Sequence, residues 1–440
     1  MPSRRFRRTV DVALVLVLLT AVAAVVLLTR GDGEQRAEVP PPPAATPTPT
    51  PTPAPTAPPP PPVATLDEPA DGPSLAVGIT EPNPNFVWAG DREVPEPFAR
   101  WREALGRLQP ELYRLVVLWD EVQPQAGVPP DLAAPNGGCM RDVQPCAAYG
   151  GVREQLGALA SRQREGGWQA LVVISGTPDW AAADRGGCRL GAEGGSAAPR
   201  RAALAAYREL IAAVVAAGQE QGADLRYFSP WNEPNHPYFI APQRAACDAG
   251  AASRSTAPYA ALAGAMAAEL EAQPGDQRLV LGETAGILER SPRATSVAET
   301  IGGLPRDLVC AAPVWSQHAY IGGTDPVAAV KRALDRLRCP RRHAIWITET
   351  GVGPAPEGFS VARGIRNERQ GCRLLHERLA TWHADPRVTL AVQYTLREDD
   401  LFPTGLVTTD LARARAALGE WQAWGARDEP SAPPPKRVCR

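Results

Sequence analysis

The sequence has almost no net charge and very little lysine. Its 46 Lys and Arg residues nearly balance its 48 Asp and Glu residues, so the formal net charge is −2 at pH 7. Proteins that bind nucleic acid through a global positive field carry a basic excess, and we therefore expect no nucleic-acid partner. Lys331 and Lys436 are the only lysines, so arginine supplies nearly all of the positive charge.

Several motifs that would indicate other chemistries are absent. The sequence contains no P-loop, no G-x-S-x-G, no EF-hand loop and no C-x-x-C, and no Cys/His spacing suits zinc. His376, Glu377 and His383 do not form H-E-x-x-H, and we interpret them as part of the solvated face of an outer helix. We therefore expect neither a metal nor another cofactor.

The first 30 residues have the pattern of a membrane anchor. An uncharged apolar run, Val12–Thr29, follows a cluster of four arginines. Eighteen helical residues rise about 27 Å, close to the roughly 30 Å of a hydrocarbon core, and the basic cluster predicts that the N-terminus stays inside. A cleaved signal peptide is the alternative, because Ala21-Val22-Ala23 fits a cleavage site. The anchor predicts a single-pass cell-membrane protein with an extracellular domain, whereas cleavage predicts a secreted protein.

Residues 31–72 form a predicted disordered stalk. Within it, residues 40–62 are Pro, Thr and Ala in near repetition. Such a segment has no core to bury and adopts extended polyproline II at about 3.1 Å per residue, or roughly 70 Å in all. A second disordered segment is predicted at residues 428–440. The predicted folded domain lies between them, at residues 73–427.

The eight cysteines are an even number, and in an exported chain they indicate disulfide bonds. Their pairing cannot be deduced from the sequence. Nearness along the chain favours Cys139 with Cys146 and Cys310 with Cys339 as first guesses.

Short β-rich apolar runs alternate with segments of helical periodicity between residues 73 and 427. The clearest helical pattern places Leu204, Tyr207, Ile211 and Val214 on one face. Eight strands alternating with helices predict an α/β fold in which a parallel sheet closes into a (β/α)8 TIM barrel. An open doubly wound sheet is the alternative, but the first strand lacks the Gly-rich phosphate turn of that fold. The predicted strands are Leu75–Ile79, Leu112–Leu118, Ala170–Ile174, Leu225–Trp231, Arg278–Gly282, Val314–Tyr320, His343–Glu349 and Leu390–Tyr394.

Two glutamates lie where predicted strands end. Glu233 follows the fourth strand in Ser-Pro-Trp-Asn-Glu-Pro, and Glu349 ends the seventh in Trp-Ile-Thr-Glu-Thr-Gly. Strands four and seven of an eight-stranded barrel lie across the mouth from each other, and the carboxyl ends of the strands form the active-site face. Two facing carboxylates suit glycoside hydrolysis, in which burial and a neighbouring charge raise the pKa of the acid. Either glutamate alone would be interpreted as a surface residue, but together they favour catalysis.

The motif Asn232-Glu233-Pro234 followed by Thr348-Glu349-Thr350-Gly351 resembles the retaining glycoside hydrolases of clan A, which are (β/α)8 barrels with carboxylates on strands four and seven. The resemblance covers the layout of most of residues 73–427, although only these short motifs are specific. It implies that Glu233 is the acid/base and Glu349 the nucleophile. Asn232 would then hydrogen-bond the sugar 2-hydroxyl.

Further residues match the same family pattern. Arg114, in the second strand, would keep the nucleophile ionised through its fixed charge. Trp180, in Gly-Thr-Pro-Asp-Trp after strand three, would offer a flat face to a sugar ring. His318 and Tyr320 end strand six, where the family tyrosine reaches the nucleophile, and Trp231 completes the predicted substrate-binding set. A core position is the alternative for Trp180 and His318.

Strand eight departs from the family pattern. Clan members commonly have a tryptophan there as a platform for the sugar at the cleavage point, whereas this chain has Gln393-Tyr394. Tyr394 or Gln393 would have to serve in its place. Glu283, after strand five, and the acidic run at 398–400 are further acids that could shape specificity.

The sequence thus predicts a membrane-tethered retaining β-glycosidase that acts on a polysaccharide or oligosaccharide. We expect a monomer, held at the membrane through residues 12–29, that works through a covalent glycosyl–Glu349 intermediate. Two alternatives stay open. One is a carbohydrate-binding barrel without catalysis, which the presence of both carboxylates counts against and the missing tryptophan weakly favours. The other is a transglycosylase that resolves the same intermediate with a sugar in place of water.

Overall fold

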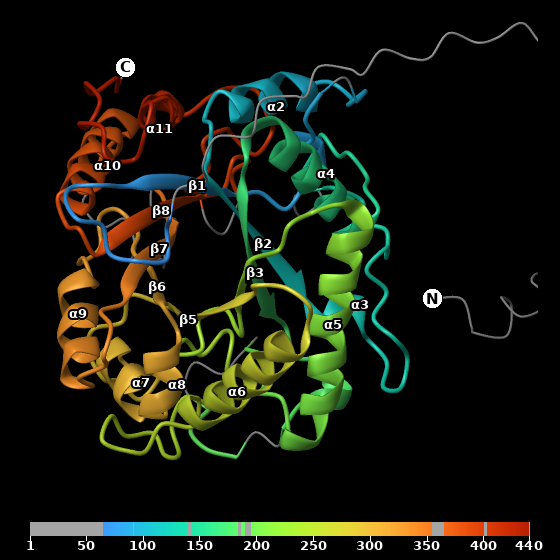
Figure 1. The fold of residues 1–440 in the computed structure, drawn as a ribbon, viewed down its shortest axis with the longest axis vertical. Helices are drawn as coiled ribbons and strands as arrows, with labels where there is room; N and C mark the ends of the chain where they lie inside the picture. Colours follow the sequence, from blue (N-terminus) through green and yellow to red (C-terminus); the bar gives the residue numbers. More distant parts are fainter. Residues whose placement is uncertain are drawn as a thin grey trace, which may run out of the picture. The chain divides into compact units, whose positions relative to one another are not determined.

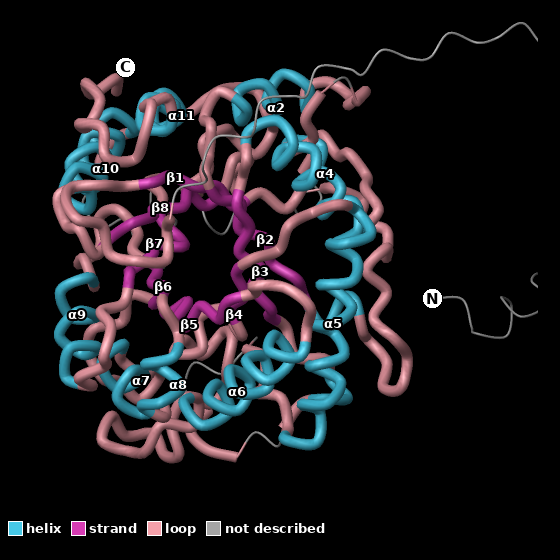
Figure 2. The backbone as a smooth tube through the Cα atoms, in the orientation of Figure 1, coloured by secondary structure: helices cyan, strands magenta, loops and turns pink. Residues whose placement is uncertain are grey.

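The computed structural model describes residues 65–90, 92–139, 143–183, 186–189, 195–353, 365–399 and 403–439. Eight parallel strands close into one barrel in the order β1 to β8, and helices surround it (Figures 1 and 2). The predicted (β/α)8 barrel is therefore confirmed. The predicted membrane anchor at 12–29 and the proline-rich repeat at 40–62 lie outside the described residues.

The strands follow the predicted order, with small differences at their ends. β4 is shorter than predicted, because Pro230 follows it and has no N–H to donate to a sheet. β6 ends at His318, two residues before the predicted end. The strands are β1 (Ala76–Thr80), β2 (Leu112–Leu118), β3 (Gln169–Ser175), β4 (Tyr227–Ser229), β5 (Arg278–Thr284), β6 (Val314–His318), β7 (Ala344–Thr350) and β8 (Val388–Tyr394).

The surrounding helices also follow the sequence pattern. In α5 (Leu204–Gln221), the predicted apolar face is buried at Tyr207, Ile211 and Val214. The left-handed Gly222 ends this helix with φ 72°. The other described helices are α2 (Phe98–Gly106), α3 (Trp119–Val122), α4 (Gly151–Gly166), α6 (Thr256–Ala272), α7 (Val297–Gly303), α8 (Arg306–Ala311), α9 (Val327–Arg336), α10 (Glu368–His383) and α11 (Ala416–Gly425), with short 3-10 helices η1 (Pro84–Phe86), η2 (Asp179–Ala181) and η3 (Arg201–Ala203).

Two apolar layers pack on the two faces of the barrel. Because successive strand residues point to opposite faces, Leu171 of β3 fills the barrel interior while Val172 faces the helices. In the interior, the rings of Tyr227 and Trp346 meet edge to face with centroids 4.8 Å apart. The interior is therefore a packed core rather than a channel.

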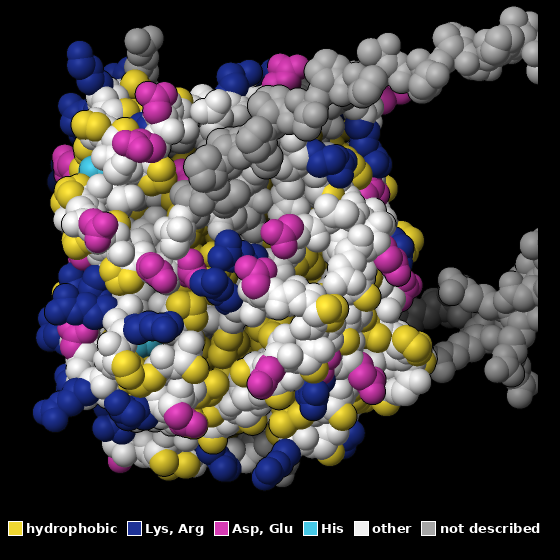
Figure 3. Space-filling model, in the orientation of Figure 1, with side chains coloured by type: hydrophobic (Ala, Val, Ile, Leu, Met, Phe, Trp, Pro, Cys, Tyr) yellow, Lys and Arg dark blue, Asp and Glu magenta, His cyan; other side chains and the backbone are white. Residues whose placement is uncertain are grey.

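Charged side chains of both signs are scattered over the face of the molecule shown in Figure 3. On the face shown in Figure 3, acidic and basic side chains are interspersed, with hydrophobic side chains between them. This mixture is what a formal net charge of −2 implies for a chain with similar numbers of acids and bases.

Residues before 73 close the amino end of the barrel. Leu66 is 2% exposed and belongs to the interior core. Its carbonyl oxygen accepts hydrogen bonds from Trp346 Nε1 (2.8 Å) and Thr389 Oγ1 (2.5 Å). Asp67 pairs with Arg278 at the start of β5. The ordered domain therefore extends into the segment that we predicted as stalk, because Leu66 covers apolar residues at this end.

All eight cysteines are paired in disulfide bonds. The two pairs that chain proximity favoured are confirmed, and the other two join segments 59 and 67 residues apart. Nearness along the chain cannot predict pairs that are so far apart in the sequence. The pairs are Cys139–Cys146, Cys188–Cys247, Cys310–Cys339 and Cys372–Cys439.

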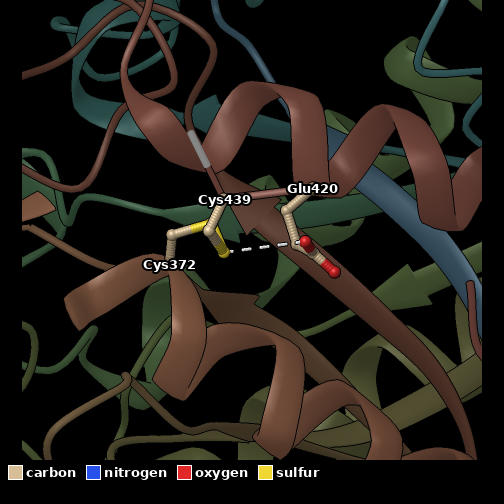
Figure 4. A group of neighbouring side chains, drawn as sticks. All are labelled: Cys372, Glu420 and Cys439. Atoms are coloured by element: carbon tan, nitrogen blue, oxygen red, sulfur yellow. Dashed lines mark hydrogen bonds between the residues drawn. A yellow bond between two sulfur atoms is a disulfide. The ribbon is translucent and has the colours of Figure 1, made fainter. Parts of the chain in front are cut away.

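Residues 428–439 pack against the barrel, although we expected no fixed structure there. The Pro430 carbonyl accepts a hydrogen bond from Leu75 N at the start of β1 (3.0 Å). Glu420 of α11 accepts one from Val438 N (3.1 Å). Figure 4 shows Glu420 beside the Cys372–Cys439 disulfide, which fastens the tail to α10. A covalent bond and a few backbone contacts hold this segment, and neither leaves a periodic pattern in the sequence.

The tail also covers histidines that we interpreted as solvated. His383 is 5% exposed, and its Nε2 lies 3.1 Å from the carbonyl oxygen of Ala432. The side chain of His376 is 20% exposed, with Nδ1 2.6 Å from Glu420 Oε1. The interpretation of a fully solvated face is therefore wrong, because α11 and the tail cover part of α10.

Removal of the Cys372–Cys439 bond is expected to cost more stability than removal of Cys139–Cys146. The first bond spans 67 residues and the second 7. A longer closed loop restricts the unfolded chain more, by about 4 compared with about 2–3 kcal/mol. Urea unfolding of the two paired Cys→Ala variants measures both losses. Equal losses would contradict the anchoring role of the long-range bond.

Candidate active site

Three glutamates meet at the carboxyl end of the barrel: Glu233 after β4, Glu283 in β5 and Glu349 in β7. The Glu283 side chain is fully buried, and those of Glu233 and Glu349 are only 14% and 9% exposed. Carboxylates at such depth need cations or hydrogen-bond donors as partners. Arg114 of β2 and His318 of β6 are those partners.

A β-bulge turns Glu349 into the site. Trp346 faces the barrel interior, so strict alternation along β7 would point Thr348 inward and Glu349 toward the helices. Two consecutive β6 residues instead pair with Ile347 and Glu349, so Thr348 is the extra residue of the bulge. The extra residue re-aims the side chain that follows it, and Glu349 enters the site.

A second bulge does the same for Glu283. Two β6 residues that are two apart pair with Leu281 and Thr284, so β5 carries one extra residue. The main chain has φ 112° at Gly282 and 46° at Glu283. A side chain at Gly282 would place Cβ 2.1 Å from the carbonyl oxygen of Ser316, so only glycine allows this approach.

The loop after β4 holds Glu233 against β5. The φ of Glu233 is 38°, which is unusual for a residue with a side chain. Its N–H donates to the carbonyl oxygen of Glu283 (2.8 Å), and its own carbonyl oxygen accepts from His236 N (2.9 Å). The buried Asn235 fastens the same loop, because its Oδ1 accepts from Ala285 N (2.8 Å). The position of Glu233 therefore depends on the main chain of β5.

Arg114 contacts two of the three glutamates. Its Nε and Nη2 donate to Glu283 Oε2 at 2.9 and 2.5 Å, and its Nη1 lies 3.0 Å from Glu349 Oε1. The structure thus brings Arg114 beside Glu349 as predicted, with Glu283 as an additional and closer partner. Arg114 Nη2 also donates to Asn232 Oδ1 (2.7 Å). This bond fixes the orientation of the Asn232 amide, whose NH2 group remains a donor.

His318 bridges all three glutamates. Its Nδ1 lies 2.8 Å from Glu233 Oε1 and 3.2 Å from Glu349 Oε2, and its Nε2 lies 3.3 Å from Glu283 Oε2. Burial lowers the pKa of an imidazole, but the charge of Glu349 and the hydrogen bonds to Glu233 and Glu283 raise the pKa of His318 to about 10. His318 is therefore an imidazolium at neutral pH, with an N–H group on each side.

Burial and neighbouring charges affect the three carboxyl groups differently. Burial favours the neutral form of Glu283, but Arg114 and His318 outweigh it and lower its pKa to about 2. Burial also opposes ionisation of Glu233, yet the hydrogen bond from His318 lowers its pKa overall. At Glu349 burial prevails over the charges of His318 and Arg114, and the pKa is raised. We expected the raised pKa at Glu233, and the order is reversed because His318 lies closer to Glu233 in the free protein.

The cluster reaches electrical balance with one proton on the Glu233–Glu349 pair. Arg114 and His318 supply two positive charges, whereas three ionised glutamates would supply three negative charges. A buried site disfavours the uncompensated charge. The pair therefore shares one proton and titrates as a unit.

Tyr320 and Tyr394 lie beside Glu349. Tyr320 Oη donates to Glu349 Oε2 at 2.7 Å. Tyr394 is half-buried at the end of β8, and burial together with Glu349 raises its pKa. Gln393 is fully buried, and its Nε2 donates to the carbonyl oxygen of Thr404 (2.8 Å). Tyr394 rather than Gln393 is therefore the β8 residue that a ligand can reach.

The two predicted tryptophans differ in exposure. Trp180 in η2 is half-buried, and its Nε1 donates to the carbonyl oxygen of Gln123 (2.9 Å). Its ring meets that of Trp119 at a right angle, with centroids 5.7 Å apart. Trp231 is fully buried between the barrel and the helices. It offers no ring face to a substrate, contrary to the prediction.

Two acids at strand ends, Glu283 and Glu81, lie in or beside the site, although the predicted catalytic and substrate-binding residues included neither. Glu283 ends Leu-Gly-Glu, much as Glu349 ends Ile-Thr-Glu, and this similarity was the available signal. Glu81 follows β1, and its carboxyl oxygens accept hydrogen bonds from Asn83 N and Arg397 N, both at 3.0 Å. Burial raises the pKa of Glu81 to about 7 despite these bonds. The glutamates at the carboxyl ends of β1, β5 and β7 therefore lie at the edge of the site or within it.

Two groups of side chains are close enough to hold a metal ion. Donor atoms of Glu233, His318 and Glu349 lie within 4.8 Å of one another. Within this group, His318 Nδ1 lies 2.8 Å from Glu233 Oε1 and 3.2 Å from Glu349 Oε2. The second group is Glu420 with the Cys372–Cys439 pair (Figure 4), whose sulfurs are bonded to each other. In both of these groups, found among the described residues, the donor atoms contact one another.

Comparison with known proteins bears on the fold. No protein-family model matches the sequence, and no curated protein matches it. Among solved structures, SrfJ from Salmonella typhimurium matches with a TM-score of 0.52 and 10% identity, over 82% of this chain and 76% of that chain. A glucosidase from Croceicoccus marinus matches with a TM-score of 0.49 and 15% identity, over 82% and 69% of the two chains. The GH53 catalytic domain of Ignisphaera aggregans has a TM-score of 0.49 and 13% identity, over 82% and 96%. At such identities the similarity concerns the fold alone.

Proposed function

We propose that this chain is a retaining glycoside hydrolase that cleaves β-glycosidic bonds in a polysaccharide or oligosaccharide. The observation that carries the proposal is the Glu233–Glu349 pair at the carboxyl end of the barrel. One carboxyl oxygen of Glu233 lies within 4.8 Å of one carboxyl oxygen of Glu349. Retaining enzymes have carboxyl groups about 5–5.5 Å apart, whereas inverting enzymes need about 6.5–9.5 Å to admit a water. The short separation supports retention.

In the proposed first step, Glu349 attacks the anomeric carbon and Glu233 protonates the leaving oxygen. Arg114 Nη1 and Tyr320 Oη face the two oxygens of Glu349 and stabilise its ionised form. The free protein favours the proton on Glu349, so the reactive form requires one proton exchange. His318 Nδ1 gives its proton to Glu233 and receives the proton of Glu349, since it lies within hydrogen-bond distance of both.

In the proposed second step, water attacks the glycosyl–Glu349 ester. Esterified Glu349 carries no charge, so Glu233 becomes the one carboxylate facing Nδ1 of the His318 imidazolium. Glu233 then acts as general base toward the water. The Asn232 amide donor is placed for the sugar 2-hydroxyl, a contact that strengthens in the oxocarbenium-like transition state.

We also propose that the enzyme is exported and tethered through residues 12–29. Disulfide bonds persist in oxidising compartments, and residues 40–62 would hold the barrel roughly 70 Å from the membrane. Protease treatment of intact cells tests this location. Loss of a membrane-bound chain to external protease supports tethering, recovery from the medium supports signal cleavage, and a protected chain contradicts export.

Turnover by a soluble chain beginning near Val63 tests the proposed activity. Beta-linked polysaccharides and aryl β-glycosides are the substrates, and early NMR spectra of the product report the anomer formed. We expect the β-anomer first. The α-anomer first would exclude retention, and products longer than the substrate would indicate transglycosylation. Binding of one glycan without any turnover would favour a carbohydrate-binding barrel.

A further inference from the structure

Glu283 is the most enclosed acid of the site. Its side chain is 0% exposed, and the bulge in β5 turns it toward the barrel axis. The proposed reaction leaves it without a chemical step, because Glu233 and Glu349 perform acid/base and nucleophilic work. A fully buried carboxylate is costly unless its surroundings repay it, so its presence calls for an explanation.

The contacts of Glu283 reach three groups of the proposed machinery. Its Oε2 accepts two hydrogen bonds from Arg114 and lies 3.3 Å from His318 Nε2. Its main-chain carbonyl oxygen accepts the N–H of Glu233 (2.8 Å). One residue thus touches both cations of the cluster through its side chain and the acid/base through its backbone.

The position of Glu283 determines what His318 can donate. With a carboxylate facing Nε2, the imidazole keeps its proton on that side and can also keep one on Nδ1. Nδ1 is the atom that faces Glu233 and Glu349. Without a negative charge at Glu283, Arg114 and His318 would be two cations with less compensation, and the imidazole would lose a proton more readily.

We propose that Glu283 is a positioning residue that keeps His318 as an imidazolium, so that one Nδ1–H is always available to the Glu233–Glu349 pair. This inference rests on the proposed function of that pair. Glu283 is fully buried and takes no chemical step in the proposed reaction, so it would act through its neighbours. The charged and titratable groups that face His318 are Glu233 of the β4 loop, Glu283 of β5, Glu349 of β7 and, through Glu283, Arg114 of β2.

The test is the titration of His318 in the full chain labelled with ¹⁵N-histidine, followed by NMR. Five histidines occur in the sequence, and a His318→Gln variant assigns the signal. In the natural sequence we expect a midpoint near pH 10. In Glu283→Gln we expect it about 1–3 pH units lower, the usual effect of losing an opposite charge at this distance. The titration needs no substrate, so it tests the role of Glu283 even if the chain hydrolyses nothing.

Two variants keep the test decisive. Glu299→Gln is the matched control, because Glu299 pairs with the buried Arg244 at 2.5 and 2.7 Å rather than with the cluster. It removes the ion pair between the buried Arg244 and Glu299, whose side chain is 19% exposed, and should leave the His318 midpoint in place. Glu283→Asp keeps the charge on a shorter side chain, and it should retain most of the natural midpoint. If the Gln variant fails to fold, the Asp variant and the natural protein still decide the matter.

The pH profile of turnover separates positioning from a merely structural role. Under the proposal, the basic limb of kcat/KM moves to lower pH by the same amount as the His318 midpoint in Glu283→Gln. A structural role would lower turnover at every pH and leave the limb in place. A His318 midpoint near 6.5 in the natural protein, or one that Glu283→Gln does not move, would overturn the proposal. Absence of turnover with a shifted midpoint would instead contradict the glycosidase function alone.

Discussion

Replacement of Glu349 by Gln is expected to lower kcat/KM by a factor of about 10⁴ or more, as for other residues that act as one catalytic unit. An amide in place of the carboxylate forms no glycosyl ester, so double displacement cannot begin. At about 1.36 kcal/mol per tenfold, this loss corresponds to at least about 5.4 kcal/mol of barrier. Initial rates on an aryl β-glycoside measure it over the required range.

The fold should survive the Glu349→Gln substitution. The amide oxygen can still accept the hydrogen bond from Tyr320, and a neutral amide replaces the carboxyl group that holds the proton in the free protein. The thermal midpoint should therefore stay close to that of the natural chain. Glu420→Gln is the matched control, because Glu420 is fully buried but bonded to His376 and Trp424 in another part of the molecule.

The two variants should separate catalysis from stability. Glu420→Gln is expected to lose stability and to keep its turnover per folded molecule. Glu349→Gln is expected to keep its stability and to lose its turnover. Retained turnover in a folded Glu349→Gln chain would exclude Glu349 as the nucleophile.

The barrel could be predicted from the sequence because its strands are short apolar runs separated by turn residues and helices. Periodicity reports which face of an element is buried, and it identified Tyr207, Ile211 and Val214 on α5. It does not report contacts made by irregular segments. Leu66 and the residues around Pro430 are held by single side chains, backbone bonds and a disulfide, so their order was missed.

The site could be predicted in outline for a related reason. Glu233 lies in the loop after β4 and Glu349 lies at the end of β7, and the carboxyl ends of barrel strands converge. Glu283 lies at the end of β5 in the same way, and simple alternation would turn both Glu283 and Glu349 outward. A bulge in each of these strands, with φ 112° at Gly282 in β5, brings the two side chains inside. A bulge depends on pairing between strands rather than on one strand's sequence.

The direction of the pKa shifts was the property that could be predicted least well from the sequence. It depends on differences of a few tenths of an ångström, such as 2.8 Å from His318 Nδ1 to Glu233 against 3.2 Å to Glu349. The sequence names the groups that can come together but gives no such distances. The reversed order in the free protein also makes the assignment of roles an experimental question.

The dependence of the hydrolysis rate on the leaving group, measured in Glu233→Ala, tests which glutamate is the acid/base. We expect this variant to hydrolyse substrates with poor leaving groups about 10²–10⁴-fold more slowly. Substrates with activated leaving groups should form the glycosyl–enzyme almost as fast as in the natural protein, because their departure needs little protonation. Loss of the general base should then slow the second step, so a burst of the released aryl alcohol should precede a slow steady state.

A series of aryl β-glycosides with leaving groups of increasing pKa gives the measurement. In Glu233→Ala, the logarithm of kcat/KM should fall steeply along the series, whereas the natural protein should respond weakly. If the roles were exchanged, Glu233→Ala would be inactive on every member, and the steep dependence would appear in the Glu349 variant instead. In the free protein the pKa of Glu349 is raised and that of Glu233 is lowered, the reverse of what the assigned roles require. Either assignment of roles is still compatible with this order, because His318 can pass a proton between the two glutamates. The slope therefore tells which glutamate holds that proton when the glycosidic bond breaks.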